Sequence, residues 1–219
     1  MIAPICTGFL ISNRLLVTAG HCHSATCEKE PNNIWYFDYT RSFLSNTPEV
    51  DGLIKLDRKD VFKCKKVLEH YYIGNAFLDI EQIDYALILL DKPVNRPHLD
   101  IRTTGRIEKN TPVITIGHPS GLVKMISDEA QVRYCHNTYY FWADLDAIDG
   151  SSGSPVINPL TNKVEGLIVR SSSGTRSFYL DSTHDCFRFK VQKYYYGGTD
   201  ISRINLIPNL DKWMNHSFR

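Results

Sequence analysis

Short runs of β-branched and aromatic residues, separated by turn residues, dominate the chain. Such runs are typical of β-strands, and we expect strands at positions 8–11, 15–19, 34–39, 61–67, 85–90, 113–116, 131–135, 139–143 and 164–170. Turn-forming residues such as Asn32-Asn33 and Gly117-His118-Pro119 lie between them. Many short strands at this spacing predict an all-β barrel or sandwich.

The apolar spacing changes near the C-terminus. Ile207, Leu210, Trp213 and Met214 recur at three- and four-residue intervals, and Pro208 is suited to a first helical turn. We therefore expect one helix there. Positions 92–112 contain prolines but no clear periodicity, so we interpret them as a linker between two halves, which we place at about 1–105 and 106–219.

Composition and charge narrow the class of protein. The 219 residues are 42% hydrophobic and 22% charged, which is enough to bury a core, and the net charge of +1 offers no electrostatic basis for binding nucleic acid or an anionic membrane. No apolar run approaches the roughly 20 residues of a spanning helix, and no secretory signal is visible at the start. Six cysteines without a C-x-x-C pair favour disulfides, and hence a secreted or periplasmic protein.

The stretch Gly150-Ser151-Ser152-Gly153-Ser154-Pro155 carries the first candidate chemistry. Glycines on both sides of Ser152 allow a sharp turn and a close approach of substrate. In such a turn the amides of Gly150 and Ser152 can converge on a developing oxyanion. An ordinary loop is the alternative for this stretch on its own. A lipase-like G-x-S-x-G elbow does not fit, because Ser154 stands where its second glycine belongs.

Two further residues suit the same chemistry. His21 ends a predicted strand beside small residues, and Asp84 opens an otherwise apolar strand. A buried carboxylate needs a partner, and a histidine Nδ1–H would satisfy it while leaving Nε2 free to accept a proton. Cys6 lies sixteen positions before Cys22, and a bridge between them would hold the hairpin that carries His21, with a chain-entropy contribution of about 3 kcal/mol.

The order His21, Asp84, Ser152, within T-A-G-H-C, D-Y-A-L and G-x-S-G-S-P, resembles the trypsin/chymotrypsin-like serine peptidases. The form G-S-S-G-S-P-V, with I-G-H-P at 116–119 and V-E-G-L at 164–167, is most similar to the bacterial branch that includes the glutamyl endopeptidases. The resemblance extends from about Cys6 to Trp213.

The resemblance implies two packed six-stranded antiparallel barrels with a C-terminal helix, His21 and Asp84 in the first and Ser152 in the second. Ser152 would attack a peptide carbonyl, His21 would relay the proton, Asp84 would orient His21, and the Gly150 and Ser152 amides would bind the oxyanion. It implies polypeptide substrates and requires no metal or cofactor. We expect a monomer.

The substrate-binding residues are less defined. Asp146 lies six residues before Ser152, where trypsin-type enzymes carry the acid that binds Arg or Lys; a structural aspartate in an acidic loop is the alternative. If the protein cuts after Glu instead, Ser171 or Arg170 would serve in the pocket. The run Val169-Arg170-Ser171 is expected to be the edge strand that pairs with substrate.

Four cysteines and the N-terminal region leave alternatives open. Cys27 and Cys64 could bridge the first barrel and Cys135 and Cys186 the second, although six cysteines allow 15 connectivities and free thiols are the alternative. Ser151 replaces the aspartate that pairs with a freed N-terminus in animal relatives. We therefore expect activity without internal zymogen cleavage. The rival hypothesis is an inactive binding module of the same fold.

Overall fold

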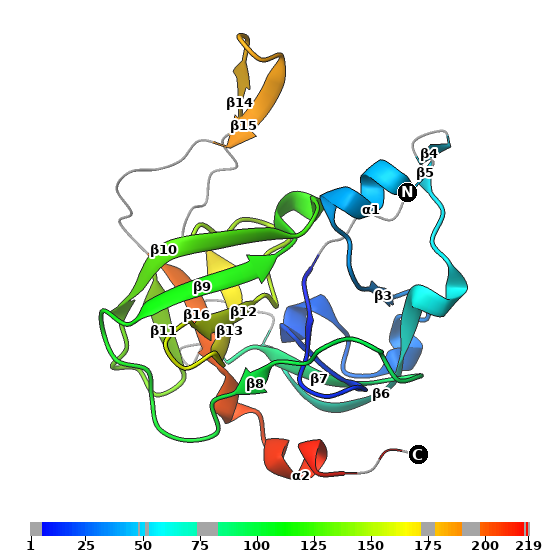
Figure 1. Ribbon diagram of the computed structural model, residues 1–219. Coiled ribbons are helices and arrows are strands. Elements are labelled where there is room, and N and C mark those ends of the chain that lie inside the picture. Colours follow the sequence, from blue (N-terminus) through cyan, green and yellow to red (C-terminus); the bar gives the residue numbers. More distant parts are fainter. Residues whose placement is uncertain are drawn as a thin grey trace.

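The computed structural model describes residues 6–47, 49–50, 53–73, 83–171, 178–189, 198–216 and 218. Two β-sheets form the body of the chain, and short helical turns connect their strands (Figure 1). The first sheet is built from the N-terminal part of the chain and the second from the C-terminal part.

The first sheet is an antiparallel half-barrel of five strands. In spatial order they are β1 (Phe9–Leu10), β2 (Leu15–Thr18), β7 (Tyr85–Leu90), β6 (Val61–Tyr71) and β3 (Ile34–Tyr36). Every residue of β2 and β7 is buried. Because successive side chains of a strand point to opposite faces, both faces of these strands must be covered, which explains their uninterrupted apolar sequence.

The second sheet closes into a six-stranded barrel. Its order is β12 (Pro155–Asn158), β9 (Pro112–Gly117), β10 (Met125–Tyr134), β11 (Tyr140–Ala143), β16 (Thr199–Arg203) and β13 (Lys163–Ser171), and the pairing of β12 with β13 completes the ring. Alternate residues such as Val113, Phe141, Val156 and Ile201 fill its interior. A short strand, β8 (Asp100–Ile101), adds in parallel to β13.

The remaining elements are short. They are the helices α1 (Arg41–Asn46) and α2 (Leu210–Met214), the paired strands β4 (Glu49–Val50) and β5 (Leu53–Ile54), the hairpin of β14 (Phe178–Asp181) and β15 (Cys186–Phe189), and the 3-10 turns η1 (Gly20–Cys22), η2 (Cys27–Lys29), η3 (Arg58–Asp60), η4 (Pro119–Gly121) and η5 (Ile204–Leu206). Figure 1 shows the β14–β15 hairpin projecting from the end of the molecule opposite α2.

The predicted fold class is confirmed, with three differences of detail. The first unit is a five-stranded half-barrel within the described residues, and the expected linker contains β8 and the start of β9. The C-terminal helix begins after its N-cap Asn209, so Pro208 lies just before the helix rather than in its first turn. Each run that we predicted to be a strand contains one, but the runs gave no sign of the pairing partners.

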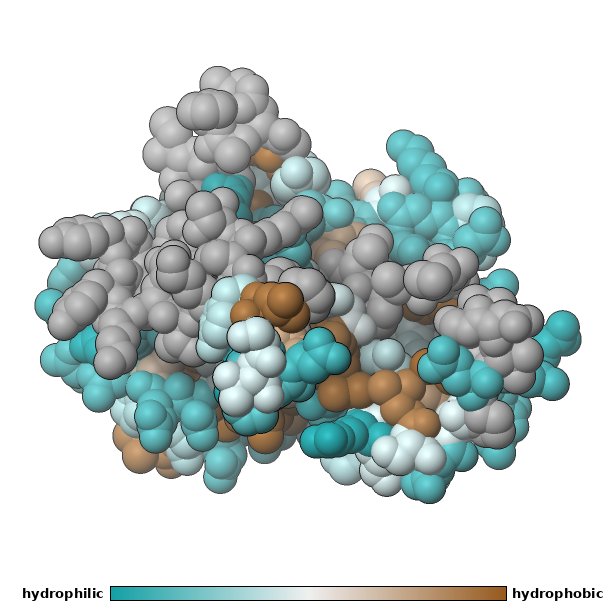
Figure 2. All heavy atoms as spheres, turned by 90° about the horizontal axis from the view of Figure 1, so that it is seen from above, coloured by the Kyte–Doolittle hydropathy of each residue, from teal (hydrophilic) through white to brown (hydrophobic). Residues whose placement is uncertain are grey.

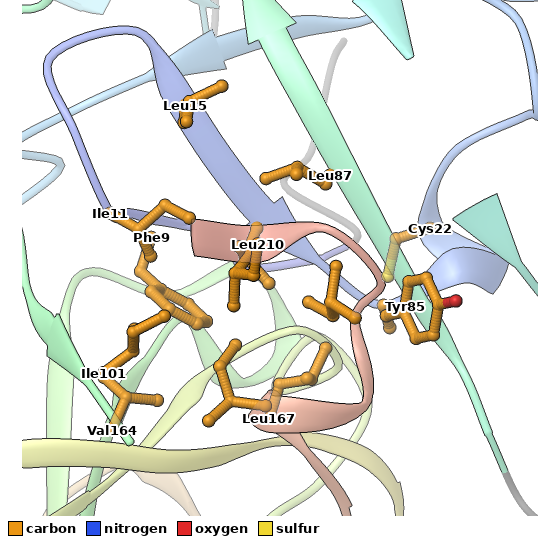
Figure 3. Close-up of a cluster of buried hydrophobic side chains, with 14 of the residues drawn as sticks. Phe9, Ile11, Leu15, Cys22, Tyr85, Leu87, Ile101, Val164, Leu167 and Leu210 are labelled. Carbon is orange, nitrogen blue, oxygen red and sulfur yellow. The ribbon is translucent and has the colours of Figure 1, made fainter. Parts of the chain in front are cut away.

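One apolar cluster joins the two sheets (Figure 3). The outward face of the half-barrel contributes Phe9, Val17 and Leu87, and the barrel contributes Val164 and Leu167. Ile204, Ile207 and Leu210 from the C-terminal segment cover the same cluster. At about 25 cal/mol per Å² of buried apolar area, a cluster of this size fixes the two sheets against each other.

Hydrophilic and hydrophobic side chains share the face in Figure 2. Teal side chains lie mainly around its edges, and brown areas are visible nearer the middle. The exposed large apolar residues include Leu122, Met125 and Ile126 at the β9–β10 end and Tyr179 and Leu180 on the β14–β15 hairpin. No helix in the described part of the chain is long and apolar enough to cross a membrane.

Two disulfides lie in the first half of the chain. Cys6 is bonded to Cys22 with a Cα–Cα distance of 6.0 Å, and Cys27 to Cys64 with a distance of 5.6 Å. Cys135 and Cys186 are free, so of the two alternatives left open for them the structure has free thiols and not a bridge. The reason is their location: Cys135 is half-buried just after β10, whereas Cys186 is exposed on the β14–β15 hairpin.

Thiol titration tests this cysteine arrangement. Under denaturing, non-reducing conditions we expect two reactive thiols per chain, one from Cys135 and one from Cys186. Replacing either residue by Ser should lower the count by one without lowering the melting temperature appreciably. A count of zero in the wild type would show that these two cysteines form a third bridge.

Candidate active site

His21 and Asp84 form the best-defined polar contact between the predicted site residues. The Nδ1 atom of His21 lies 2.7 Å from Oδ2 of Asp84, and the backbone N–H of His21 donates to Oδ1 at 3.1 Å. The Asp84 side chain is 1% exposed, whereas the His21 side chain is 28% exposed. A buried carboxylate is therefore satisfied by two donors from one residue, and the imidazole keeps its Nε2 edge on the accessible side.

The local backbone explains how His21 reaches Asp84. His21 lies in the 3-10 turn η1, directly after β2, and Asp84 directly precedes β7, the neighbour of β2. A Cβ on Gly20 would lie 2.3 Å from the carbonyl oxygen of Tyr71 and 3.1 Å from Asp84 Oδ1. Only glycine permits this close packing.

A second histidine, His70, holds the same turn. Its Nε2 lies 3.0 Å from the carbonyl oxygen of Gly20 and 2.9 Å from that of His23. Because both partners are acceptors, this nitrogen carries the proton. His70 thus binds both ends of the turn that presents His21. The ring of Tyr72 lies beside the imidazole of His21, with centroids 5.7 Å apart.

Ser152 lies in the turn before β12 and is packed against the first sheet. Its carbonyl oxygen accepts from the Thr7 amide at 2.8 Å and lies 3.8 Å from the Cys22 sulfur. A Cβ on Gly153 would lie 2.4 Å from Thr18 Oγ1 and 3.0 Å from the Ala19 nitrogen. Ser152 is therefore held against the segment that carries His21. No hydrogen bond joins Ser152 Oγ to His21 Nε2 in this structure, and such contacts often tighten only when substrate binds.

The peptide groups around Ser152 are held in an unusual pattern. The carbonyl of Asp149 accepts from Ser120 N–H at 2.6 Å, and that of Ser151 accepts from Ser154 N–H at 2.9 Å. In a trans peptide the C=O and N–H groups point in opposite directions. The amides of Gly150 and Ser152 belong to the same peptide groups as these two carbonyls. They thus point away from Ser120 and Ser154, which bind the carbonyls.

The other amides of this turn have acceptors. Ser151 N–H donates to the Ile148 carbonyl at 2.9 Å, and Gly153 N–H donates to the Ile168 carbonyl at 2.7 Å. Within the described part of the chain, the amides of Gly150 and Ser152 donate to no protein acceptor. The positive φ of Gly150, 92°, and of Gly153, 83°, make this backbone course available. Two neighbouring N–H groups that donate to no protein acceptor are what an anion-binding pocket requires.

The predicted substrate-binding residues are more dispersed. Asp146 is exposed, and its amide donates to Ser127 Oγ at 3.2 Å. Its neighbours Leu145 and Ala147 are buried in the barrel, whereas Asp146 itself is at the surface. Val169 is buried at a bulge in β13, and Arg170 and Ser171 pair with Asp200 and Thr199 of β16. The pairing of β13 with β12 ends at Leu167.

Sequence inspection did not single out Asp200 or Thr7. Asp200 is half-buried opposite Arg170, and burial raises its pKa to about 6, while the Arg170 charge opposes this rise. The only sequence signal was one acidic residue in the otherwise neutral run Thr199-Asp200-Ile201-Ser202. Thr7 is buried between the first sheet and the Ser152 turn; nothing in its sequence context marks it.

Among the described residues, one group of three potential metal ligands is clustered, namely Cys6, His21 and Cys22. The two sulfur atoms are bonded to each other. Metal-binding cysteines act as thiolates, so this cluster lacks the ligands that a metal site would need.

Comparison with known proteins identifies the family and agrees with the fold. Residues 6–167 match the family described as the trypsin-like peptidase domain. A search of curated protein sequences found no match. Among solved structures, the serine protease neuropsin of mouse brain is 14% identical, with a TM-score of 0.59 over 97% of this chain and 89% of that one.

A bacterial structure is similar at the same level. The inactive form of the Rv3671c protease of M. tuberculosis is 14% identical, with a TM-score of 0.51 over 96% of this chain and 84% of that one. These two likenesses concern the fold. The family match covers most of the chain, from Cys6 in front of β1 to Leu167 in β13. The chain belongs to the trypsin-like peptidase domain family.

Proposed function

We propose that the protein is a serine endopeptidase in which Ser152 is the nucleophile, His21 the general base and acid, and Asp84 the residue that orients His21. The observation that carries this proposal is the Ser152 turn, in which the amides of Gly150 and Ser152 are left without acceptors beside a hydroxyl. An ordinary loop has no reason to leave two buried or half-buried donors unused, because each unsatisfied donor costs about 1–3 kcal/mol. A substrate oxyanion is the acceptor that this arrangement suits.

The His21–Asp84 contact supports the same mechanism. Asp84 accepts a hydrogen bond from Nδ1–H of His21, which leaves Nε2 as the ring nitrogen that can accept a proton. Ser152 Oγ would attack the carbonyl carbon of the scissile peptide while Nε2 takes its proton. The tetrahedral oxyanion would be stabilised by the two amides, and the imidazolium by Asp84. Nε2 would then protonate the leaving amine, and water would hydrolyse the acyl-enzyme by the same steps.

For the cleavage preference, two carboxylates are candidates for binding a basic side chain. Asp200 faces Arg170, which already supplies a positive charge next to it. Asp146 is exposed and lies six residues before Ser152, the position at which trypsin-type enzymes carry the acid that binds Arg or Lys. We therefore propose Asp146 as the residue that binds Arg or Lys of the substrate, with 169–171 as the strand that pairs with the substrate backbone. The likeness to the glutamyl endopeptidase branch stays a prediction.

We also propose that the protein works outside the reducing cytosol. The two disulfides support this, because structural disulfides persist in secreted and periplasmic proteins. Both lie in the half of the chain that carries His21, so reduction would loosen the histidine side of the site first.

Labelling with a fluorophosphonate tests the nucleophile. We expect stoichiometric labelling of the wild type and none of Ser152→Ala, because only an activated serine attacks the reagent. Ser151→Ala, which removes the neighbouring hydroxyl, is the matched control and should still be labelled. A folded protein with intact disulfides that takes no label would contradict the proposal and favour a binding module.

A peptide-library cleavage profile tests the pocket. We expect cleavage after Arg or Lys, and Asp146→Ala should lower kcat/KM for such substrates about 10- to 100-fold, the value of a charge-assisted hydrogen bond of about 1.5–3 kcal/mol. Asp144→Ala is the control. It removes a carboxylate from the same segment, but this carboxylate already pairs with Arg133. Cleavage after Glu, or an unchanged profile in Asp146→Ala, would leave Asp146 with a structural role.

The raised pKa of Asp200 predicts how stability depends on pH. A carboxyl group whose pKa rises from 3.8 to about 6 on folding binds its proton more tightly in the native state, so the free energy of unfolding falls as pH rises between these values. Asp200→Asn should therefore raise stability at pH 7 by about 1 kcal/mol, after discounting for partial exposure and for the lost Arg170 interaction. Thermal unfolding at pH 7 and pH 3.5 measures this.

Most of the gain should disappear at the lower pH, where Asp200 is protonated in the native state and largely protonated in the unfolded state. Asp128→Asn, a change at an exposed carboxylate of β10, is the control and should change stability little at either pH. A loss of stability in Asp200→Asn at pH 7 would show that the Arg170 interaction outweighs the desolvation of the carboxylate.

A further inference from the structure

Thr7 makes four hydrogen bonds that link the first sheet to the Ser152 turn. Its N–H donates to the Ser152 carbonyl at 2.8 Å, and its carbonyl accepts from Thr18 Oγ1 at 2.7 Å. Its hydroxyl donates to the Gly150 carbonyl at 3.0 Å and accepts from the His118 N–H at 3.0 Å. The residue is 5% exposed, so all four contacts are shielded from water.

The hydroxyl contacts act on the two peptides that flank Gly150. The first contact holds the Gly150 carbonyl directly. The second fixes His118, which precedes the η4 turn, and the Ser120 N–H of that turn binds the Asp149 carbonyl at 2.6 Å. The orientation of the Asp149–Gly150 peptide decides whether the Gly150 amide points into the proposed oxyanion site. Thr7 therefore binds this turn from both sides.

The contacts of Thr7 are made by its hydroxyl and by backbone groups. Ser151, whose side chain is buried, accepts from the Ile148 N–H at 3.3 Å through its own hydroxyl. The hydroxyls of Thr7 and Ser151 and the backbone of residues 118–121 thus all contribute to holding the turn. Gly150 must be glycine for this arrangement, because a Cβ there would lie 2.5 Å from the His118 carbonyl and 2.8 Å from the Ser120 nitrogen.

We infer that Thr7 is a positioning residue whose side-chain hydroxyl holds the Gly150 amide in the orientation that binds the oxyanion. This inference rests on the proposed peptidase function and adds the device that keeps its site assembled. Thr7 touches neither the substrate nor the reacting atoms; it acts through Gly150 and His118. The hydroxyl donates one hydrogen bond and accepts another. Of the side chains of similar size, only that of Ser can also do both.

The substitution Thr7→Val tests the inference, because valine keeps the shape, the β-branch and the backbone N–H but removes the hydroxyl. We expect kcat on a peptide substrate to fall about 10- to 100-fold with KM changed less than about threefold, since the loss concerns a group that stabilises the transition state. Affinity for a peptide boronate, which mimics the tetrahedral intermediate, should fall in parallel. Thr7→Ser should restore most of both.

Thr115→Val is the matched control. Thr115 has the same 5% exposure, and its hydroxyl also donates to a buried carbonyl, that of Pro155 at 2.9 Å, but it does not contact the 149–152 turn. Its variant should lose stability comparably and keep kcat. An unchanged kcat in Thr7→Val, or an equal fall in Thr115→Val, would overturn the inference.

Amide hydrogen exchange separates this inference from the proposed function. In Thr7→Val the exchange of the Ser120 amide should accelerate at least about tenfold, because the loop that holds it loses its link to Thr7, and Thr115→Val should leave it unchanged. If the wild type takes no fluorophosphonate but the exchange result holds, the proposed function fails, whereas the role of Thr7 in holding the turn is confirmed. If the wild type is labelled and exchange is unchanged in Thr7→Val, the role of Thr7 is wrong and the proposed function stands.

Discussion

The contact between the two sheets is the constraint on which the rest of the structure depends. His21 and Asp84 belong to the half-barrel, whereas Ser152 belongs to the barrel, so their relative placement depends on packing. The strands that carry them supply the shared apolar cluster: Val17 and Ala19 precede His21, Tyr85 follows Asp84, and Ile157 and Leu167 lie behind the Ser152 turn. Protein interiors are close-packed and deform little. A cavity in this cluster would therefore cost stability and also displace one half of the site against the other.

Polar groups at the sheet contact add orientation to this packing. Each must find a partner, since an unpaired buried group costs about as much as a lost hydrogen bond. Asp84 meets this requirement with the His21 amide and imidazole. Thr7 meets it with two carbonyls, an amide and the Thr18 hydroxyl, which belong to three separate segments. The same requirement makes the unused amides of Gly150 and Ser152 conspicuous. They gain a partner only when a ligand supplies one, which is how a preorganised site differs from a loop.

The sequence predicted what local pattern encodes. Apolar runs located β2 and β7, and small residues around His21 and Ser152 located the turns, because close backbone approach there excludes side chains. What it did not predict depends on contacts distant in the chain. The Thr7 hydroxyl meets Gly150 across 143 positions and His118 across 111, and no local pattern marks such a residue. The state of Cys135 and Cys186 was left open for the same reason, since an even count of cysteines contains no information on the distances between them. The burial of Asp200 depends likewise on its pairing with β13.

The uncharged hydroxyl of Thr7, which contacts Gly150 and His118, affects how the site responds to pH. A turn held by an ammonium–carboxylate pair loses its hold when the amine deprotonates, whereas a threonine hydroxyl does not titrate in the range where proteins are folded. His118, whose backbone N–H donates to the Thr7 hydroxyl, has a titratable side chain, and burial lowers its pKa, so its neutral form is favoured near pH 7. The backbone N–H that contacts Thr7 is the same in both protonation states. The two hydrogen bonds of the Thr7 hydroxyl should therefore persist over the whole pH range in which the protein is folded.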